Sequence, residues 1–241
     1  NYSKSGAQFN KVSEYEDIVA APRSTAGGAV QLVNVSDPGS PTEISDFSVP
    51  GNPQKVVFDY PYSYIIQESP GGLSVYSLFN VSNPTEVSTA STRGGIDAAY
   101  DNKGYVYAAT GAPEIEVYNV TDRLDASHAN TKSLLLTSTR DVTYRDNHLY
   151  VVMDDDVAVY DVSDASSINR VSTLSIDDGD EGVLWRDYWF ISDGSDGYDV
   201  IDVSDPRDID RVTSQGFSSD VTGIHAGHDA LYLYFDNTSV S

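Results

Sequence analysis

One short motif returns five times along this 241-residue chain, and its spacing limits what the chain can fold into. The copies are Val33-Asn34-Val35-Ser36-Asp37-Pro38, Phe79-Asn80-Val81-Ser82-Asn83-Pro84, Tyr118-Asn119-Val120-Thr121-Asp122, Tyr160-Asp161-Val162-Ser163-Asp164 and Ile201-Asp202-Val203-Ser204-Asp205-Pro206. Their central valines are 46, 39, 42 and 41 residues apart. A period near forty in a chain rich in β-forming residues predicts a repeated β-sheet unit.

Each unit is expected to supply four short strands, because its runs of Val, Ile, Tyr and Thr lie between clusters of Gly, Asp, Asn and Pro. The fold class predicted is therefore all-β, a single β-propeller of six four-stranded blades. In the third unit we expect the fourth strand at Ser133–Thr139, and the polar segment Asp122–Lys132 has room for a helical turn. The blades are placed at residues 10–51, 52–95, 96–139, 140–180, 181–220 and 221–241 plus 1–9.

The sixth blade is expected to be a composite of N- and C-terminal strands. Residues 221–241 are too few for four strands, so the segment Asn1–Phe9 is assigned to complete the set. Closure within one molecule would remove exposed sheet edges, which promote association. An exchange between molecules would instead make a head-to-tail contact, and such contacts propagate as filaments. The sequence favours closure within the molecule and leaves the exchange open.

The motif has a mechanical explanation. The Asn or Asp before its valine, and the Asp or Asn after its Ser or Thr, can accept hydrogen bonds from nearby backbone N–H groups. Pro38, Pro84 and Pro206 then prevent the strand from continuing. We therefore interpret the motif as a turn that ends a strand.

The charge balance excludes one class of partner. The chain has 37 acidic and 14 basic residues and a formal net charge of −23, so nucleic-acid binding is not expected. The excess of Asp and the scarcity of Lys are typical of proteins from salt-loving archaea; a calcium-rich extracellular surface protein is the alternative, compatible with the first.

There is no cysteine, and no apolar run approaches the length of a membrane span. The chain begins at Asn1 and not at Met, which removal of a signal peptide would explain.

Acidic side chains are the best candidates for a metal site. One member of each of four units lies just before the innermost strand, where the units of a ring would converge at one mouth of the channel. Calcium prefers such carboxylate and carbonyl oxygens. The predicted cation ligands are Asp97, Asp141, Asp180, Glu181 and Asp220. Three acidic loops are further candidates, with solvated loops as the alternative: Asp154–Asp156, Asp177–Glu181 and Asp193–Gly197.

No other motif indicates a reaction. The chain has no nucleophile elbow, phosphate-binding glycine loop or zinc-protease helix. His225 and His228 are a weak metal pair, because residues three apart on a strand face opposite sides. Sequons allow glycosylation if the protein is exported, although most are also turn residues. The candidate glycosylation sites are Asn34, Asn80, Asn119 and Asn237, and Asn1 also begins a sequon.

With this motif and period the chain resembles the LVIVD-repeat family of β-propellers, found in bacterial and archaeal extracellular and surface proteins. The segments that carry the resemblance are Gln31–Pro38, Val157–Asp164 and Tyr198–Pro206. The third and fourth units depart from the pattern, with Arg123 and Ala165 in place of the motif proline. The resemblance implies the fold and an exported location, and it implies no reaction.

We expect a non-enzymatic extracellular or cell-surface protein that binds partners or self-associates through its propeller, as a subunit of a surface assembly or filament. Its seventeen tyrosines support this expectation, because exposed Tyr favours interfaces. The alternative is an enzyme of the six-bladed hydrolase or lactonase kind, with a channel-mouth calcium as Lewis acid. A sensor or ligand carrier is a third reading. Calcium is the one candidate cofactor, and no other is expected.

Overall fold

The computed structural model describes residues 9–24, 27–68, 71–134, 137–194, 197–217, 220–227 and 230–235. Within these ranges the chain is all-β, with twenty-two strands and no helix. The strands form five four-stranded antiparallel sheets and one two-stranded sheet, each made of strands that follow one another in sequence. This is the repeated antiparallel unit that the motif predicts. The contacts divide the chain into two compact units, Asn1–Thr110 with Glu116–Thr131, and Gly111–Ile115 with Lys132–Ser241.

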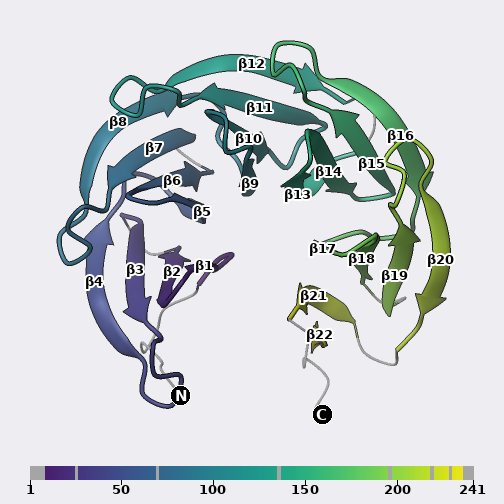
Figure 1. Ribbon diagram of the computed structural model, residues 1–241, viewed down its shortest axis with the longest axis horizontal. Coiled ribbons are helices and arrows are strands. Elements are labelled where there is room, and N and C mark those ends of the chain that lie inside the picture. Colours follow the sequence, from purple (N-terminus) through teal and green to yellow (C-terminus); the bar gives the residue numbers. More distant parts are fainter. Residues whose placement is uncertain are drawn as a thin grey trace. The chain divides into compact units, whose positions relative to one another are not determined.

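The first unit contains the first two sheets and most of the third (Figure 1). Their strands are β1 (Ser13–Tyr15), β2 (Ile18–Arg23), β3 (Ala29–Asn34), β4 (Thr42–Ser48), β5 (Pro53–Asp59), β6 (Tyr62–Gln67), β7 (Gly72–Ser77), β8 (Thr85–Ser91), β9 (Asp97–Tyr100), β10 (Tyr105–Ala109), β11 (Glu114–Asn119) and β12 (Ser127–Ser133). β1, β5 and β9 lie beside one another, while β4, β8 and β12 lie on the outside (Figure 1). This order brings the faces of successive sheets together.

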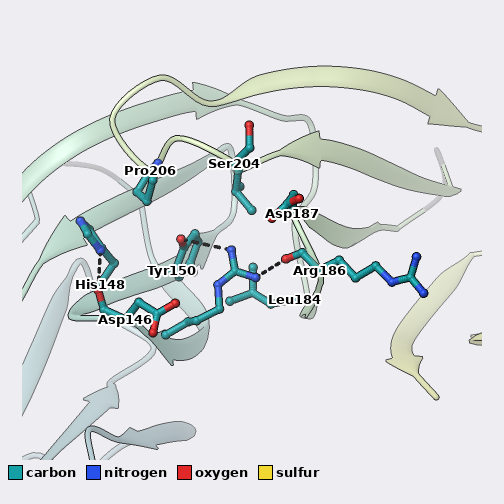
Figure 2. A pocket seen from close by; sticks show the side chains of 10 residues that line it. Asp146, His148, Tyr150, Leu184, Arg186, Asp187, Ser204 and Pro206 are labelled. Atoms are coloured by element: carbon teal, nitrogen blue, oxygen red, sulfur yellow. Dashed lines mark hydrogen bonds between the residues drawn. The ribbon is translucent and has the colours of Figure 1, made fainter. Parts of the chain in front are cut away.

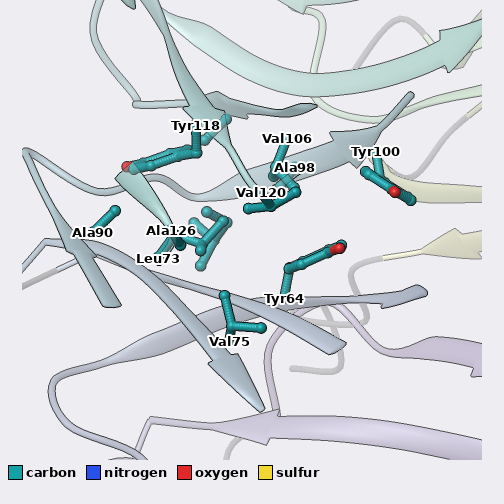
Figure 3. Close-up of a cluster of buried hydrophobic side chains, with 12 residues drawn as sticks. Tyr64, Leu73, Val75, Ala90, Ala98, Tyr100, Val106, Tyr118, Val120 and Ala126 are labelled. Carbon is teal, nitrogen blue, oxygen red and sulfur yellow. The ribbon is translucent and has the colours of Figure 1, made fainter. Parts of the chain in front are cut away.

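Apolar side chains fill the space between those faces. Between the second and third sheets, Tyr64 and Leu73 pack with Val106, Tyr118 and Val120, and all five are less than 2% exposed (Figure 3). A second cluster joins the first sheet to the second. Burying such side chains contributes about 1.5–3 kcal/mol each. Packing between sheets therefore holds the unit together without helices.

The second unit repeats the arrangement. Its strands are β13 (Thr139–Arg145), β14 (His148–Met153), β15 (Asp156–Asp161), β16 (Asn169–Ser175), β17 (Gly182–Trp185), β18 (Tyr188–Asp193), β19 (Gly197–Asp202), β20 (Asp210–Gln215), β21 (Val221–Ala226) and β22 (Leu231–Phe235). The ring of Trp189 packs edge-on against Tyr150, with centroids 5.4 Å apart, inside the cluster between the fourth and fifth sheets. The last sheet consists of β21 and β22 in the described part of the chain.

The structure confirms the motif as a turn. In four copies the first Asn or Asp accepts a hydrogen bond from the backbone N–H two residues later, at 2.8–3.0 Å, and Asn80 of the second copy accepts one from Ser82 at 3.2 Å. The Asp after the Ser or Thr does the same at 2.9 Å in four copies. Hydrogen bonds from the hydroxyl and the backbone N–H of Ser163 lower the pKa of Asp161. These local bonds compete with the strand ladder and so end each third strand.

The second copy of the motif was aligned wrongly from the sequence. In four sheets the motif valine donates its backbone N–H to the hairpin that joins the first two strands; these valines are Val35, Val120, Val162 and Val203. In the second sheet Leu78 makes this hydrogen bond and Val81 does not. The equivalent residues are therefore spaced 43, 42, 42 and 41 apart, more evenly than the valines. Asn80 corresponds to Asp37 of the first copy, since each accepts the backbone N–H three residues later. An Asn-Val-Ser triplet that recurs three residues late produced the error.

Two further expectations are corrected. The fourth strand of the third sheet is β12, Ser127–Ser133, and neither Ser133–Thr139 nor a helical turn occupies that place. β12 is almost wholly exposed and polar, so it carries no alternation of apolar residues to reveal it. Phe9, assigned to the composite blade, instead bridges Arg23 at the end of β2. Residues 1–8 and 236–241 lie outside the described residues, so the composite blade stays a prediction.

Candidate functional site

A cavity of about 630 Å³ lies between the fourth and fifth sheets (Figure 2). Three turns form its wall: the β13–β14 hairpin, the β17–β18 hairpin and the motif turn that follows β19. Its lining residues are Arg145, Asp146, His148, Tyr150, Leu184, Arg186, Asp187, Val203, Ser204 and Pro206. Its volume falls in the range of roughly 300–1,000 Å³ that is typical of small-molecule sites.

Arg145 is the cation in the wall of this cavity. Its Nη1 donates to the backbone carbonyl of Arg186, and its Nη2 donates to the hydroxyl of Tyr150 at 3.4 Å. The guanidinium carbon lies 5.3 Å from the centre of the Tyr150 ring. Within the described ranges, Arg145 forms no ion pair with a carboxylate, whereas Arg23, Arg123, Arg140 and Arg211 each do. Among the described residues, the hydrogen-bond acceptors of Arg145 are therefore neutral groups.

Arg186 contributes its backbone and not its charge. Its guanidinium stacks on Trp185, with the guanidinium carbon 4.4 Å from the ring centre. Figure 2 shows the Arg186 side chain extending away from Tyr150 and Ser204. The backbone of Arg186 has a φ of 55°, a left-handed conformation that closes the tight β17–β18 hairpin. This turn aims the Arg186 carbonyl at Arg145.

His148 is held in one tautomer by its neighbour. Its Nδ1 donates to the backbone carbonyl of Asp146 at 2.9 Å, so in the neutral ring Nε2 is the acceptor. Nε2 is buried and has no hydrogen-bond partner among the described residues. Asp146 is exposed at the rim. The cavity thus combines a guanidinium, a phenol, an imidazole and rim carboxylates.

The equivalent position in the first unit is filled by a closed ionic network. Asp59 ends β5 as Arg145 ends β13, and its carboxylate accepts two hydrogen bonds from Arg123, at 2.6 Å and 3.2 Å. The hydroxyl of Tyr64 donates to Asp59 at 2.7 Å, and Arg123 also contacts the hydroxyl of Tyr100 at 3.1 Å. The hydrogen bond with Asp59 raises the pKa of Arg123 above its ordinary value, and burial raises the pKa of Tyr64.

The predicted cation ligands lie apart from the cavity. Asp97 is 2% exposed and lies between two ammonium groups, 3.2 Å from Lys11 Nζ and 3.8 Å from Lys55 Nζ. Asp141 is buried as well, while Asp180 and Asp220 are exposed and Glu181 accepts the backbone N–H of Ile224 at 3.2 Å. Among the residues that the structure describes, no three His, Asp or Glu side chains form a group that could hold a metal ion. Asp97 belongs to the first unit and the other four to the second, so their convergence stays a prediction.

Carboxylates of the acidic loops accept hydrogen bonds from other residues of the protein. Asp154 accepts a hydrogen bond from Arg140 Nε at 2.5 Å, and Asp193 accepts the backbone N–H of Asp178 at 2.7 Å. These contacts give the carboxylates structural roles. Residues 195–196 of the third loop, and His228 of the histidine pair, lie outside the described residues.

The candidate glycosylation sites are turn residues wherever the structure describes them. The amide oxygens of Asn34, Asn80 and Asn119 cap the turns described above, and Asn80 is exposed. Asn237, like Asn1, lies outside the described residues. Their modification stays a prediction.

The first sheet and the last two sheets present apolar side chains to solvent. On the first sheet a groove of about 260 Å³ is lined by Phe9, Val12, Val19, Ala21, Gln31, Val33, Val35 and Pro41. Val12 is 56% exposed there. On the second unit β20 is exposed along its whole length, and on β22 Tyr232 and Tyr234 are 55% and 58% exposed. We call these the first-sheet groove and the β20–β22 surface.

Sequence reasoning missed the cavity residues Arg145, His148 and Tyr150. The available signal was a reversal of charge at one position. The residue that ends the first strand is Asp59 in the second sheet and Arg145 in the fourth sheet. That comparison requires the hairpin register, which the misaligned second motif obscured.

Comparison with solved structures supports a propeller-like fold. A candidate 6-phosphogluconolactonase from Bacteroides uniformis is similar with a TM-score of 0.77 at 14% identity, over 91% of this chain and 74% of that one. The computationally designed protein Ika8 is similar with a TM-score of 0.68 at 12% identity, over 93% of this chain and 67% of that one. No family model matches the chain, and no curated protein matches it in sequence. At these identities the likeness concerns the fold alone.

Within the described residues, no helix has the length and apolar character needed to cross a membrane.

Proposed function

We propose that this protein is a non-enzymatic binding and assembly module of the LVIVD-repeat kind, which acts outside the cell or on its surface. The observation that carries the assembly role is the exposure of apolar side chains in the first-sheet groove and on the β20–β22 surface. Exposed apolar patches of this kind typically mark interaction sites. The repeated motif and the net charge of −23 support the exported, salt-adapted setting.

The first-sheet groove and the β20–β22 surface are proposed to be complementary. In each unit, the fourth strand of one sheet is covered by the next sheet: Ser45 donates to the carbonyl of Val81, Ser88 to that of Arg123, and Ser172 to that of Pro206, at 2.7–2.8 Å. Strand β20 carries Thr213 at the same position, but among the described residues Thr213 Oγ1 donates only to the carbonyl of the adjacent Ser214, at 3.4 Å. A further sheet packed against β20 would offer an acceptor to the Thr213 hydroxyl and would also bury Val212.

Six blades would follow if residues 1–8 and 236–241 completed the sheet of β21 and β22. Within one molecule this closes the propeller, and between molecules it makes a head-to-tail filament. Closure is the arrangement that we favour, because it leaves no exposed sheet edge. Glycosylation of the exposed sequons is part of the same proposal.

A lactonase-like enzyme with a channel calcium receives less support. Asp97, one of its five predicted ligands, already has two lysine partners, so binding of calcium there would have to displace Lys11 and Lys55. The lactonase-like neighbour shares the fold alone. Calcium added at constant ionic strength distinguishes the readings: a rise of the melting temperature that Asp141→Asn abolishes would favour the enzyme.

Light scattering of purified variants tests the proposed assembly surfaces. Val12→Asp and Tyr234→Asp place a charge on the first-sheet groove and on the β20–β22 surface, and Leu124→Asp, at a turn residue that is 66% exposed, is the matched control. We expect the first two, and deletion of Asn1–Phe9, to lower the melting temperature if the contact is intramolecular or to dissociate the assembly if it is intermolecular. The proposal fails if both variants match Leu124→Asp in mass and in melting temperature.

A further inference from the structure

The repeat provides an internal comparison for the cavity between the fourth and fifth sheets. Asp59 pairs with Tyr62 across its hairpin as Arg145 pairs with His148 across its own, so Asp59 and Arg145 are equivalent. Tyr64 and Tyr150 then occupy the same place on the second strand, and each contacts the charged residue through its hydroxyl. The two sites differ in the sign of the charge.

Among the described residues, a side chain of opposite charge pairs with Asp59, and none pairs with Arg145. Arg123 follows Asp122 in the motif turn of the third sheet, and Pro206 follows Asp205 in the motif turn of the fifth. The backbone carbonyls of Asp122 and Asp205 accept equivalent turn hydrogen bonds, from Asp125 and Asp208, at 3.2 Å and 3.0 Å. Arg123 and Pro206 therefore occupy equivalent positions. The Arg123 side chain extends from this position to Asp59, whereas Pro206 leaves the space beside Arg145 open.

We propose that the cavity binds a small organic monocarboxylate, which pairs with Arg145 as Asp59 pairs with Arg123. The guanidinium of Arg145 has five N–H donors, of which two have protein acceptors. The planar fork of a guanidinium matches a carboxylate in shape and charge, and such charge-assisted bonds are about twice as strong as neutral ones. The cavity volume of about 630 Å³ leaves room for the rest of the ligand.

The rim determines which anion is accepted. Asp146 and Asp187 are exposed carboxylates in the wall of the same cavity. They repel a second negative charge, so a dianionic phosphate is disfavoured relative to a monocarboxylate. They also accept hydrogen bonds from a hydroxyl group, and the hydroxyl of Ser204 adds another polar partner. A hydroxy monocarboxylate fits this set best.

This site is independent of the proposed assembly role. None of its lining residues belongs to the first-sheet groove or to the β20–β22 surface. Loss of assembly and loss of carboxylate binding are therefore separate results.

NMR titration of the full chain, labelled with ¹⁵N at arginine, tests the proposal. The probes are lactate, the uncharged lactamide of the same shape, and inorganic phosphate, all at constant ionic strength. We expect lactate to shift the Nε–Hε resonance of Arg145, with lactamide and phosphate at least tenfold weaker. Arg145→Gln should weaken lactate binding at least tenfold, and Arg140→Gln, at an arginine that is 46% exposed and does not line the cavity, should leave it unchanged.

A second variant distinguishes loss of binding from loss of folding. The double substitution Arg145→Asp with Pro206→Arg rebuilds the Asp59–Arg123 pair in the cavity, so we expect a folded protein by circular dichroism that no longer binds lactate. The proposal is overturned if lactate fails to bind the wild-type chain, if lactamide or phosphate binds as well as lactate, or if Arg145→Gln retains the affinity.

Discussion

A repeated fold can place opposite charges at the same position of different units. Asp59 and Arg145 end equivalent strands, yet one accepts hydrogen bonds from an arginine and the other is an arginine. Both sites place a buried tyrosine beside the charge, Tyr64 or Tyr150, and its hydroxyl contacts the charged residue. Side-chain chemistry therefore varies on a scaffold that the strand pairing keeps constant.

The Asp59–Arg123 pair should be measurably coupled. Its side chains are 23% and 32% exposed and share a network with Tyr64, so a double-mutant cycle with Asp59→Asn and Arg123→Gln should give about 1 kcal/mol of coupling in urea unfolding. Arg140 and Asp154, which are 46% and 30% exposed, are the matched control. Equal coupling in both cycles would contradict a stabilising role for the network.

Buried tyrosines should make the fold sensitive to alkaline pH. Burial raises the pKa of Tyr118 and of Tyr160 from 10.0 to about 12. The folded state then keeps protons that the unfolded state releases, so this contribution to stability is complete below pH 10 and is lost as pH rises toward 12. Each such group steepens the decline by up to about 1.4 kcal/mol per pH unit.

Urea unfolding between pH 8 and pH 12 measures this decline, and tyrosinate absorbance reports which tyrosines ionise. Tyr118→Phe and Tyr160→Phe should each flatten the curve. Tyr234→Phe is the control, because Tyr234 is 58% exposed and should leave the slope unchanged. A slope that stays the same in all three variants would contradict the assignment.

Some residue roles could be predicted from the sequence and others could not. The turn-capping roles of Asp37 and Asp161 follow from local chemistry, and the structure confirms them. The role of Arg145 depends on Pro206, which is 61 residues away and contributes by having no charge. A missing partner leaves no pattern in the sequence near Arg145.

Among the strands, exposure separates what could be predicted from what could not. Strands β5, β6 and β14 alternate or concentrate apolar residues because they are packed between sheets, so these runs are visible in the sequence. Strand β12 has no apolar face, so only its pairing with β11 defines it. The outer strands of a propeller-like sheet are therefore the least visible in sequence.

The hydroxyl contact between neighbouring sheets should stabilise them. Ser88 donates to the carbonyl of Arg123 at 2.7 Å and lies 3.4 Å from the backbone nitrogen of Ala126, so Ser88→Ala leaves both groups without this partner. We expect a loss of about 1 kcal/mol of unfolding free energy. Ser91→Ala, at an exposed position of the same strand, should cost less than half as much. Equal losses would mean that the contact contributes nothing specific.

For the whole molecule, the dominant quantity is its net charge of −23. Like charges repel more strongly in the compact state than in the expanded unfolded chain, so dilute buffer should destabilise the fold. Screening shortens the reach of each charge from about 30 Å at 0.01 M salt to about 3 Å at 1 M. The same screening would allow acidic copies to approach one another through the first-sheet groove and the β20–β22 surface.

We therefore expect the melting temperature to rise steeply with potassium chloride over that range, because screening removes repulsion that the folded state alone suffers fully. Calorimetry at a series of salt concentrations measures the rise. Sucrose at matched osmolality is the control, since it stabilises compact states by exclusion from their surface without screening charge. A salt effect no larger than the sucrose effect, or a flat profile, would remove the salt-adapted part of the proposed function. The charge would then serve only to keep the protein soluble.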